Sequence, residues 1–101
     1  MAYVTGTLAA DGNGDEIIIN SKGLLYVGLV GGNTFGSGTV TLQYKAPTGA
    51  WCNSGVTTTT SKVISIDTNG IPTPVRIVLS GATTPDLDYV IESDLRYVAV
   101  S

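Results

Sequence analysis

The sequence contains no histidine, and only one cysteine, one tryptophan and one phenylalanine. Without histidine, the neutral-pH base of a Ser-His-Asp or Cys-His relay is missing, so catalysis of that kind is excluded. The single thiol, Cys52, cannot form an internal disulfide, which is typical of a chain that folds in a reducing cytoplasm. Its nearest basic residue in the sequence is Lys45, so we expect an unreactive thiol.

Charged residues are scarce as well. They make up 13% of the 101 residues, where about 25% is usual for soluble domains. The net charge is −3 and the basic residues do not cluster, so nothing supplies the counterion release that drives nucleic-acid binding. We therefore expect no nucleic-acid partner. The surface must consist largely of Thr, Ser, Gly and Asn, a composition that favours packing against other protein.

The sequence also lacks a long hydrophobic run. The longest, Gly23 to Gly32, is about half of the roughly 20 residues that a membrane-spanning helix requires. The sequence therefore predicts no membrane span. The first residues, "MAYVTGTLAADG", show neither the positive n-region nor the apolar core of a secretion signal, so we expect synthesis in the cytoplasm without Sec export.

What the chain does contain is short alternating runs separated by Gly, Pro, Asn and Asp. In "GTVTLQYK", Val40, Leu42 and Tyr44 share one face and the polar residues share the other. Similar runs occupy 3–9, 16–20, 24–30, 56–66, 75–80 and 88–100. We predict one all-β domain over residues 1–101, an antiparallel β-sandwich or jelly-roll-like barrel of about seven to eight strands. The predicted core contains Val40, Leu42, Tyr44, Ile77, Leu79, Tyr89 and Ile91.

Two polar loops imitate ligand-binding motifs. The stretch "DGNGDE" places Asp11, Asn13 and Asp15 at alternate positions, as in a calcium loop, but lacks the required Gly and the final Glu. The stretch "GGNTFGSGT" has the glycine spacing of a phosphate loop, but Ser37 stands where the lysine is needed. We interpret both as turns, and we expect neither a metal ion nor a cofactor.

Four acidic residues lie close together near the end of the chain: Asp86, Asp88, Glu92 and Asp94. Even spacing would place all four on one face of a strand, where like charges repel, so we expect a bend or bulge before Asp94. The patch is typical of a solvated edge or of a partner for Lys and Arg on another subunit. We expect no glycosidase chemistry from it.

The only Trp and the only Cys follow a Pro-Thr-Gly turn in "TVTLQYKAPTGAWCNSG", residues 39–55. Because Tyr44 belongs to the inward set and Trp51 begins the return strand, we predict that their rings meet as a structural clasp. Cys52 would fill space beside it. A carbohydrate-binding module would instead expose Trp51, Tyr3 or Tyr97 as a platform.

The segments "GTVTLQYKAPTGAW" and "PVRIVLSGATTPDLDYVIE", joined by a Thr-rich strand, resemble small β-sandwich proteins of tailed-bacteriophage virions. Tyr44 and Trp51 match the hairpin of that group, and Arg76, Leu79, Ser80 and Gly81 match its later strand. Such proteins decorate capsids as cement proteins, often as trimers, or form parts of tails and fibres. The resemblance implies a capsid decoration protein that binds the major capsid protein and stabilises the shell.

We therefore expect a non-enzymatic homo-oligomer, a trimer, on the capsid surface of a virion, after synthesis in the host cytoplasm. The apolar N-terminal segment and the Gly-rich loop are the expected partner contacts, through Tyr3, Val4, Leu8 and Phe35. The alternative from another class is a receptor- or carbohydrate-binding domain of a phage tail fibre.

Overall fold

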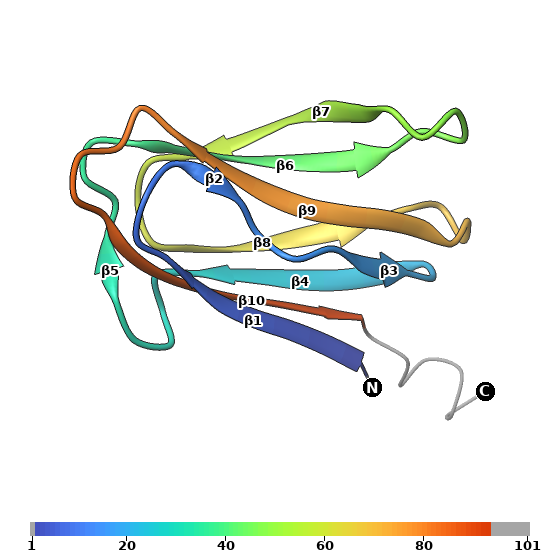
Figure 1. Cartoon of the computed structure of the whole chain (residues 1–101). Coiled ribbons are helices and arrows are strands. Elements are labelled where there is room, and N and C mark those ends of the chain that lie inside the picture. The colour runs from blue at the N-terminus through green and yellow to red at the C-terminus, as the bar shows by residue number, and fades with distance from the viewer. Residues whose placement is uncertain (1, 94–101) are drawn as a thin grey trace.

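The computed structural model describes residues 2–93, which form ten strands and no helix (Figure 1). The alternating runs of the sequence form the longer strands, because period-two spacing gives each strand one apolar face. The strands are β1 (Ala2–Leu8), β2 (Gly12–Asn13), β3 (Ile17–Ile19), β4 (Lys22–Val27), β5 (Asn33–Thr34), β6 (Thr39–Lys45), β7 (Trp51–Thr58), β8 (Lys62–Asp67), β9 (Thr73–Ser80) and β10 (Asp86–Ser93).

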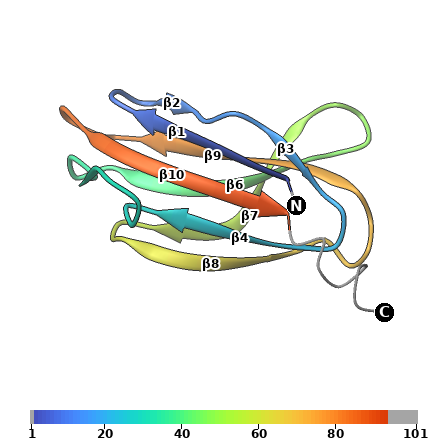
Figure 2. The same ribbon diagram turned by 90° about the horizontal axis from the view of Figure 1, so that it is seen from below.

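The strands assemble into two sheets that pack face to face. Sheet I has the order β1-β10-β4-β8, with the short β5 also paired to β10. Sheet II has the order β2-β9-β6-β7, with β3 also paired to β9. All of these pairings are antiparallel. Figure 2 shows β10, β4 and β8 in front of the strands of sheet II. The predicted antiparallel β-sandwich is confirmed.

The inward-facing residues of both sheets form one continuous core. Six of the seven predicted core residues are buried in it: Val40, Leu42, Ile77, Leu79, Tyr89 and Ile91. Tyr44, the seventh, is half-buried and packs against the cluster from its edge. Partial burial and the nearby charge of Asp67 raise the pKa of Tyr44 above its usual value.

Tyr89 attaches the start of the chain to the middle of the sandwich. Its ring is buried, and its hydroxyl accepts a hydrogen bond from the Asp15 backbone N–H at 2.8 Å. The N–H of Gly14 donates to the carbonyl of Ile77, also at 2.8 Å. A Cβ on Gly14 would stand 2.7 Å from the Tyr89 hydroxyl oxygen, so only glycine permits this approach.

One predicted strand is in fact two. The run 56–66 is interrupted at residues 59–61, where the Thr58 hydroxyl donates to the carbonyl of Thr60 and the Ser61 hydroxyl donates to the carbonyl of Gly28. The chain crosses there from β7 in sheet II to β8 in sheet I. The predicted strand 88–100 begins two residues earlier, at Asp86, and the predicted bend before Asp94 lies outside the described residues.

Candidate interaction surfaces

The β6–β7 hairpin places Trp51 on the outer face of sheet II. The register pairs Lys45 with Trp51, and Tyr44 with Cys52. Since paired residues share a face and successive residues alternate, Trp51 and Tyr44 lie on opposite faces of the sheet. The predicted Tyr44–Trp51 clasp is therefore wrong, because the turn at residues 46–50 sets Trp51 opposite Lys45. Cys52 is exposed and does not fill a core space as predicted.

Arg76 covers the ring of Trp51. Its guanidinium carbon lies 4.2 Å from the ring centroid, and the Lys45 ammonium lies 5.7 Å from it. The Arg76 Nε donates to the Gln43 side-chain oxygen at 2.9 Å, and the Gln43 side-chain nitrogen donates to the Asn53 oxygen at 2.8 Å. This chain of contacts across β9, β6 and β7 orients the guanidinium. Within residues 2–93 its two terminal nitrogens have no hydrogen-bond acceptor.

We call this surface the cationic face, defined by Gln43, Lys45, Trp51, Asn53 and Arg76. The strands of sheet II contain Lys45 and Arg76 but no Asp or Glu. The five residues that define the face therefore carry charge of one sign only. A partner that covers it gains most by presenting carboxylates, since electrostatic complementarity guides association and orientation.

The outer face of sheet I carries several apolar side chains and, near the end of β10, the acid Glu92. Two cross-strand rows cross it, Tyr3–Glu92–Leu24–Ser65 and Thr5–Val90–Tyr26–Val63. Tyr3 is 64% exposed and Val63 is 47% exposed. The Tyr26 hydroxyl donates to the Glu92 carboxylate at 3.1 Å. We call this surface the acidic face, defined by Tyr3, Leu24, Tyr26, Val63, Val90 and Glu92.

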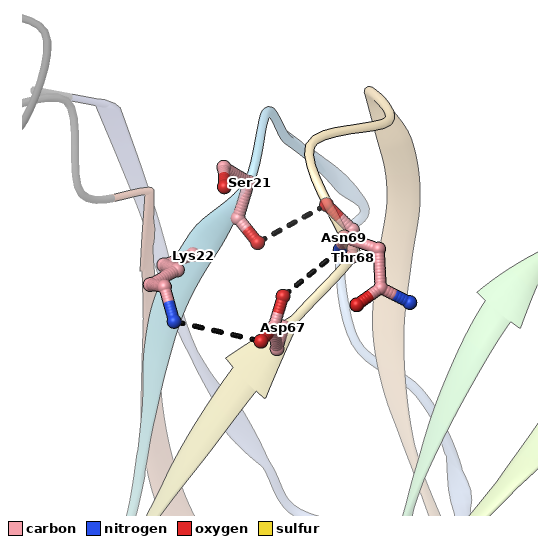
Figure 3. Close-up of polar contacts among 5 residues, drawn as sticks. All are labelled: Ser21, Lys22, Asp67, Thr68 and Asn69. Atoms are coloured by element: carbon pink, nitrogen blue, oxygen red, sulfur yellow. Dashed lines mark hydrogen bonds and ion pairs between the residues drawn. The ribbon is translucent and has the colours of Figure 1, made fainter.

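Asp67 lies at one end of this face, and nearby groups compensate the negative charge of its carboxylate (Figure 3). Its carboxylate accepts the Asn69 N–H at 2.9 Å and lies 3.5 Å from the Lys22 ammonium. The hydrogen bond from Asn69 and the charge of Lys22 lower the pKa of Asp67. The Thr68 N–H donates to the Ser21 carbonyl at 2.7 Å, which joins the two turns.

The carboxylate of Asp88, in β10, also has hydrogen-bond donors within the chain. It accepts the Thr7 hydroxyl at 2.6 Å and the Gly32 N–H at 2.9 Å, and these two bonds lower its pKa. Lys22–Asp67 is the single ion pair in the part of the chain that the structure describes. Glu92 is therefore a carboxylate of the acidic face without a cationic partner among these residues.

Of the four predicted contact residues, Tyr3 alone is exposed. In β1, Val4 packs against the core and Leu8 is buried in it, so both side chains point inward. Phe35 is buried in the same cluster. Leu8 and Phe35 expose little of their side chains to a partner, and the contact role of the partly buried Val4 stays a prediction. The role of Tyr3 stays a prediction, and Tyr97 lies outside the described residues.

The loop at Asp11 has a structural role that the sequence did not reveal. Its carboxylate accepts the backbone N–H groups of Gly81 and Ala82, at 3.0 and 2.8 Å. It thereby ties the start of the chain to the turn between β9 and β10. Within residues 2–93, no three His, Cys, Asp or Glu side chains lie together as a metal site, and no helix is long and apolar enough to cross a membrane.

A hollow of about 650 Å³ lies between the 46–49 turn and residues 71–74. Its lining is mainly apolar and includes three prolines, Ala46 and Ile71, and Lys45 is its one ionisable side chain. An acid–base pair, which general acid–base catalysis needs, is missing from this lining.

Comparison with known proteins gives no match to a family, to a curated protein or to a solved structure.

Proposed function

We propose that the protein is a structural component of a tailed-bacteriophage virion, a capsid decoration protein that binds the major capsid protein on the outer surface of the head. The exposed apolar surface of the sandwich carries the proposal. Several large side chains are 47–64% exposed, namely Tyr3, Ile18, Leu29, Val30, Val63 and Ile71. Together with a low charge content, such a surface is a liability in an isolated protein and is stabilising when other protein covers it.

The distribution of charge supports a binding role over a catalytic one. The cations Lys45 and Arg76 lie on one outer face, and the acids of β10 belong to the opposite sheet. This separation suits contacts with partner surfaces, and we propose a non-enzymatic function without a cofactor. The resemblance to virion sandwiches, which spans residues 38–92, is the observation that points to a virion.

We propose that the protein stabilises the shell by thermodynamic linkage between its binding and shell assembly. A protein that binds only the assembled shell shifts the equilibrium toward the intact particle. Copies that also bind one another would engage several shell sites at once and gain avidity. We therefore propose a homo-oligomer, with the trimer of the resembled proteins as the expected state.

The test is to locate the chain in intact particles by cryo-electron microscopy and to compare particles made with and without it. We expect the protein on the head, and we expect shells that lack it to assemble but to rupture at a lower temperature. Finding it only at the tail tip, or unattached to particles, would contradict the proposal.

A second candidate is a carbohydrate-binding domain of a tail fibre, which the outward position of Trp51 favours. Sugars stack on exposed aromatic rings, but here Arg76 lies 4.2 Å from the ring centroid and covers one side. Trp51 is the only Trp, so its fluorescence reports on this site directly. A Trp51→Ala variant that folds normally yet loses attachment to host polysaccharide would favour this candidate.

A further inference from the structure

We propose that Arg76 on the cationic face of one copy binds Glu92 on the acidic face of a second copy, so that copies associate head to tail. This inference rests on the proposed self-association, but not on the expected trimer, and adds which surfaces meet. It does not depend on attachment to a capsid.

The Arg76 side chain is already oriented to bind a carboxylate in the single chain. The Trp51 ring supports the guanidinium plane at 4.2 Å, and Gln43 holds Nε at 2.9 Å. The two terminal nitrogens, which form the fork that grips a carboxylate through two parallel bonds, remain available within the described chain. Because the side chain is already ordered, binding costs less conformational entropy than it would for a free arginine.

Glu92 is placed to meet such a fork. Its carboxylate is positioned by the Tyr26 hydroxyl, and its neighbours in the same row are Tyr3 and Leu24. When a second copy covers this face, these apolar neighbours exclude water. An opposite charge then interacts more strongly with Glu92, because the local dielectric constant falls. Asp67 is less suitable because Lys22 already pairs with it, and Asp88 is less suitable because Thr7 and Gly32 both donate to its carboxylate.

The two faces complement each other, whereas like faces do not. Two acidic faces would bring Glu92 against Glu92, and two cationic faces would bring Arg76 and Lys45 against their own copies, which repel. The molecule measures 44 × 30 × 18 Å, so its broad faces can supply the roughly 800 Å² per partner of a stable interface.

The contact is heterologous, because it joins different surfaces of identical copies. The two sheets form separate layers whose outer faces point in opposite directions (Figure 1). Each copy can therefore take one neighbour on either side, which distinguishes this contact from those of a closed trimer.

Charge reversal in purified protein tests the contact by sedimentation velocity over a range of concentrations. We expect Arg76→Glu and Glu92→Arg each to weaken association about tenfold or more. An equimolar mixture of the two variants should restore it, because each altered face then meets its complement. Lys62→Glu, which makes the same charge change as Arg76→Glu at an exposed position of β8 outside both faces, should leave association unchanged.

Two further measurements separate loss of contact from loss of fold. Thermal melting by circular dichroism checks that each variant is folded. Glu92→Gln keeps an acceptor for Tyr26 but removes the charge, and it should weaken association while leaving the melting temperature close to that of the wild type. Trp51 emission should shift with concentration in the wild type and not in Glu92→Gln.

The contact is overturned if the wild type stays monomeric, if folded reversal variants associate as the wild type does, or if their mixture does not restore association. A trimer that ignores both reversals would also overturn it and would leave the capsid proposal standing. Failure to find the chain on particle heads would contradict the capsid proposal and would leave the contact between Arg76 and Glu92 standing.

Discussion

At the scale of single residues, Trp51 and Arg76 show how a large ring can be held in place on an outer surface. Arg76 covers one side of the ring, and Lys45 lies farther from it. A cation over an aromatic ring at a surface contributes about 0.5–1 kcal/mol. The contact therefore stabilises the hairpin only modestly, and its greater effect is to fix the direction of the guanidinium.

Trp51→Ala is expected to lower the free energy of unfolding by about 1–2 kcal/mol, which combines the lost cation–π contact with partial loss of burial. Urea denaturation measures it, with Thr57→Ala on the same outer face as the control. A loss above about 3 kcal/mol, typical of a ring removed from a core, would contradict the surface assignment.

Gly14→Ala is expected to destabilise the protein by about 1–3 kcal/mol, because the added methyl group would overlap the buried Tyr89 hydroxyl. The ring cannot yield freely, since its oxygen is bonded to the Asp15 N–H. Thermal melting checks this, and Asn13→Ala, at an exposed neighbouring position, should change little. Equal melting temperatures for the two variants would show that the Tyr89 ring moves aside at little cost and contradict the prediction.

Asp88 predicts a dependence of stability on pH. Its folded-state pKa is lowered by the bonds from Thr7 and Gly32, so the unfolded chain binds the proton more tightly. The contribution of Asp88 is therefore present above its unfolded pKa, about 3.9, and is lost as the pH falls through the folded value. Denaturation from neutral to acidic pH should give a flatter profile for Asp88→Asn than for Asp86→Asn. If the two variants showed the same dependence of stability on pH, Asp88 would not be a cause of that dependence.

At the scale of elements, the edge strand β7 carries a bulge. Thr41 pairs with Thr57 and Gln43 pairs with Asn53, so β7 has two more residues than β6 over this stretch. Gly55 lies within the bulge with φ of 87°, a conformation that other residues rarely adopt. A bulge interrupts the ladder of an edge strand and hinders pairing with the edge of another molecule.

Gly55→Ala is therefore expected to cost about 1–2 kcal/mol of stability, because the side chain strains a backbone that must keep positive φ. Gly55→Asn should cost less, since asparagine visits positive φ more readily. Chemical denaturation of both variants gives the comparison. An alanine variant as stable as the wild type would mean that the bulge rearranges without cost.

The elements also show how far the sequence could predict the fold. Val40 and Leu42 were placed correctly because alternation alone determines their face. Trp51 was placed on the wrong face because its side depends on the length of the turn before it. The break after Thr58 and the link from Asp11 to Gly81 depend on partners distant in sequence, so no local pattern reveals them.

At the scale of the whole molecule, the two outer faces differ in charge as well as in shape. Sheet II has no acidic residue in its strands, while sheet I contains all of the acids found in the strands of the described chain. The proposed partner surface on sheet II was not visible in the sequence, since it arises only when β6, β7 and β9 bring Lys45, Trp51 and Arg76 together.

Association through these faces should depend on salt. Raising the salt concentration from about 0.1 to 1 M shortens the screening length from about 10 to 3 Å, which weakens steering between the faces. We expect the association constant to fall in sedimentation experiments, and Glu92→Gln should respond less than the wild type. Association that strengthens with salt would point to apolar contact alone.

The pairing of β1 with β10 sets Ala2 opposite Ser93, so both ends of the described chain leave the same end of the sandwich. A pulling force applied between these two points would load the bonds of the β1–β10 ladder one rung at a time, beginning with the outermost. The sandwich should therefore unzip at low force, whereas a load applied across its opposite ends would have to break many bonds together.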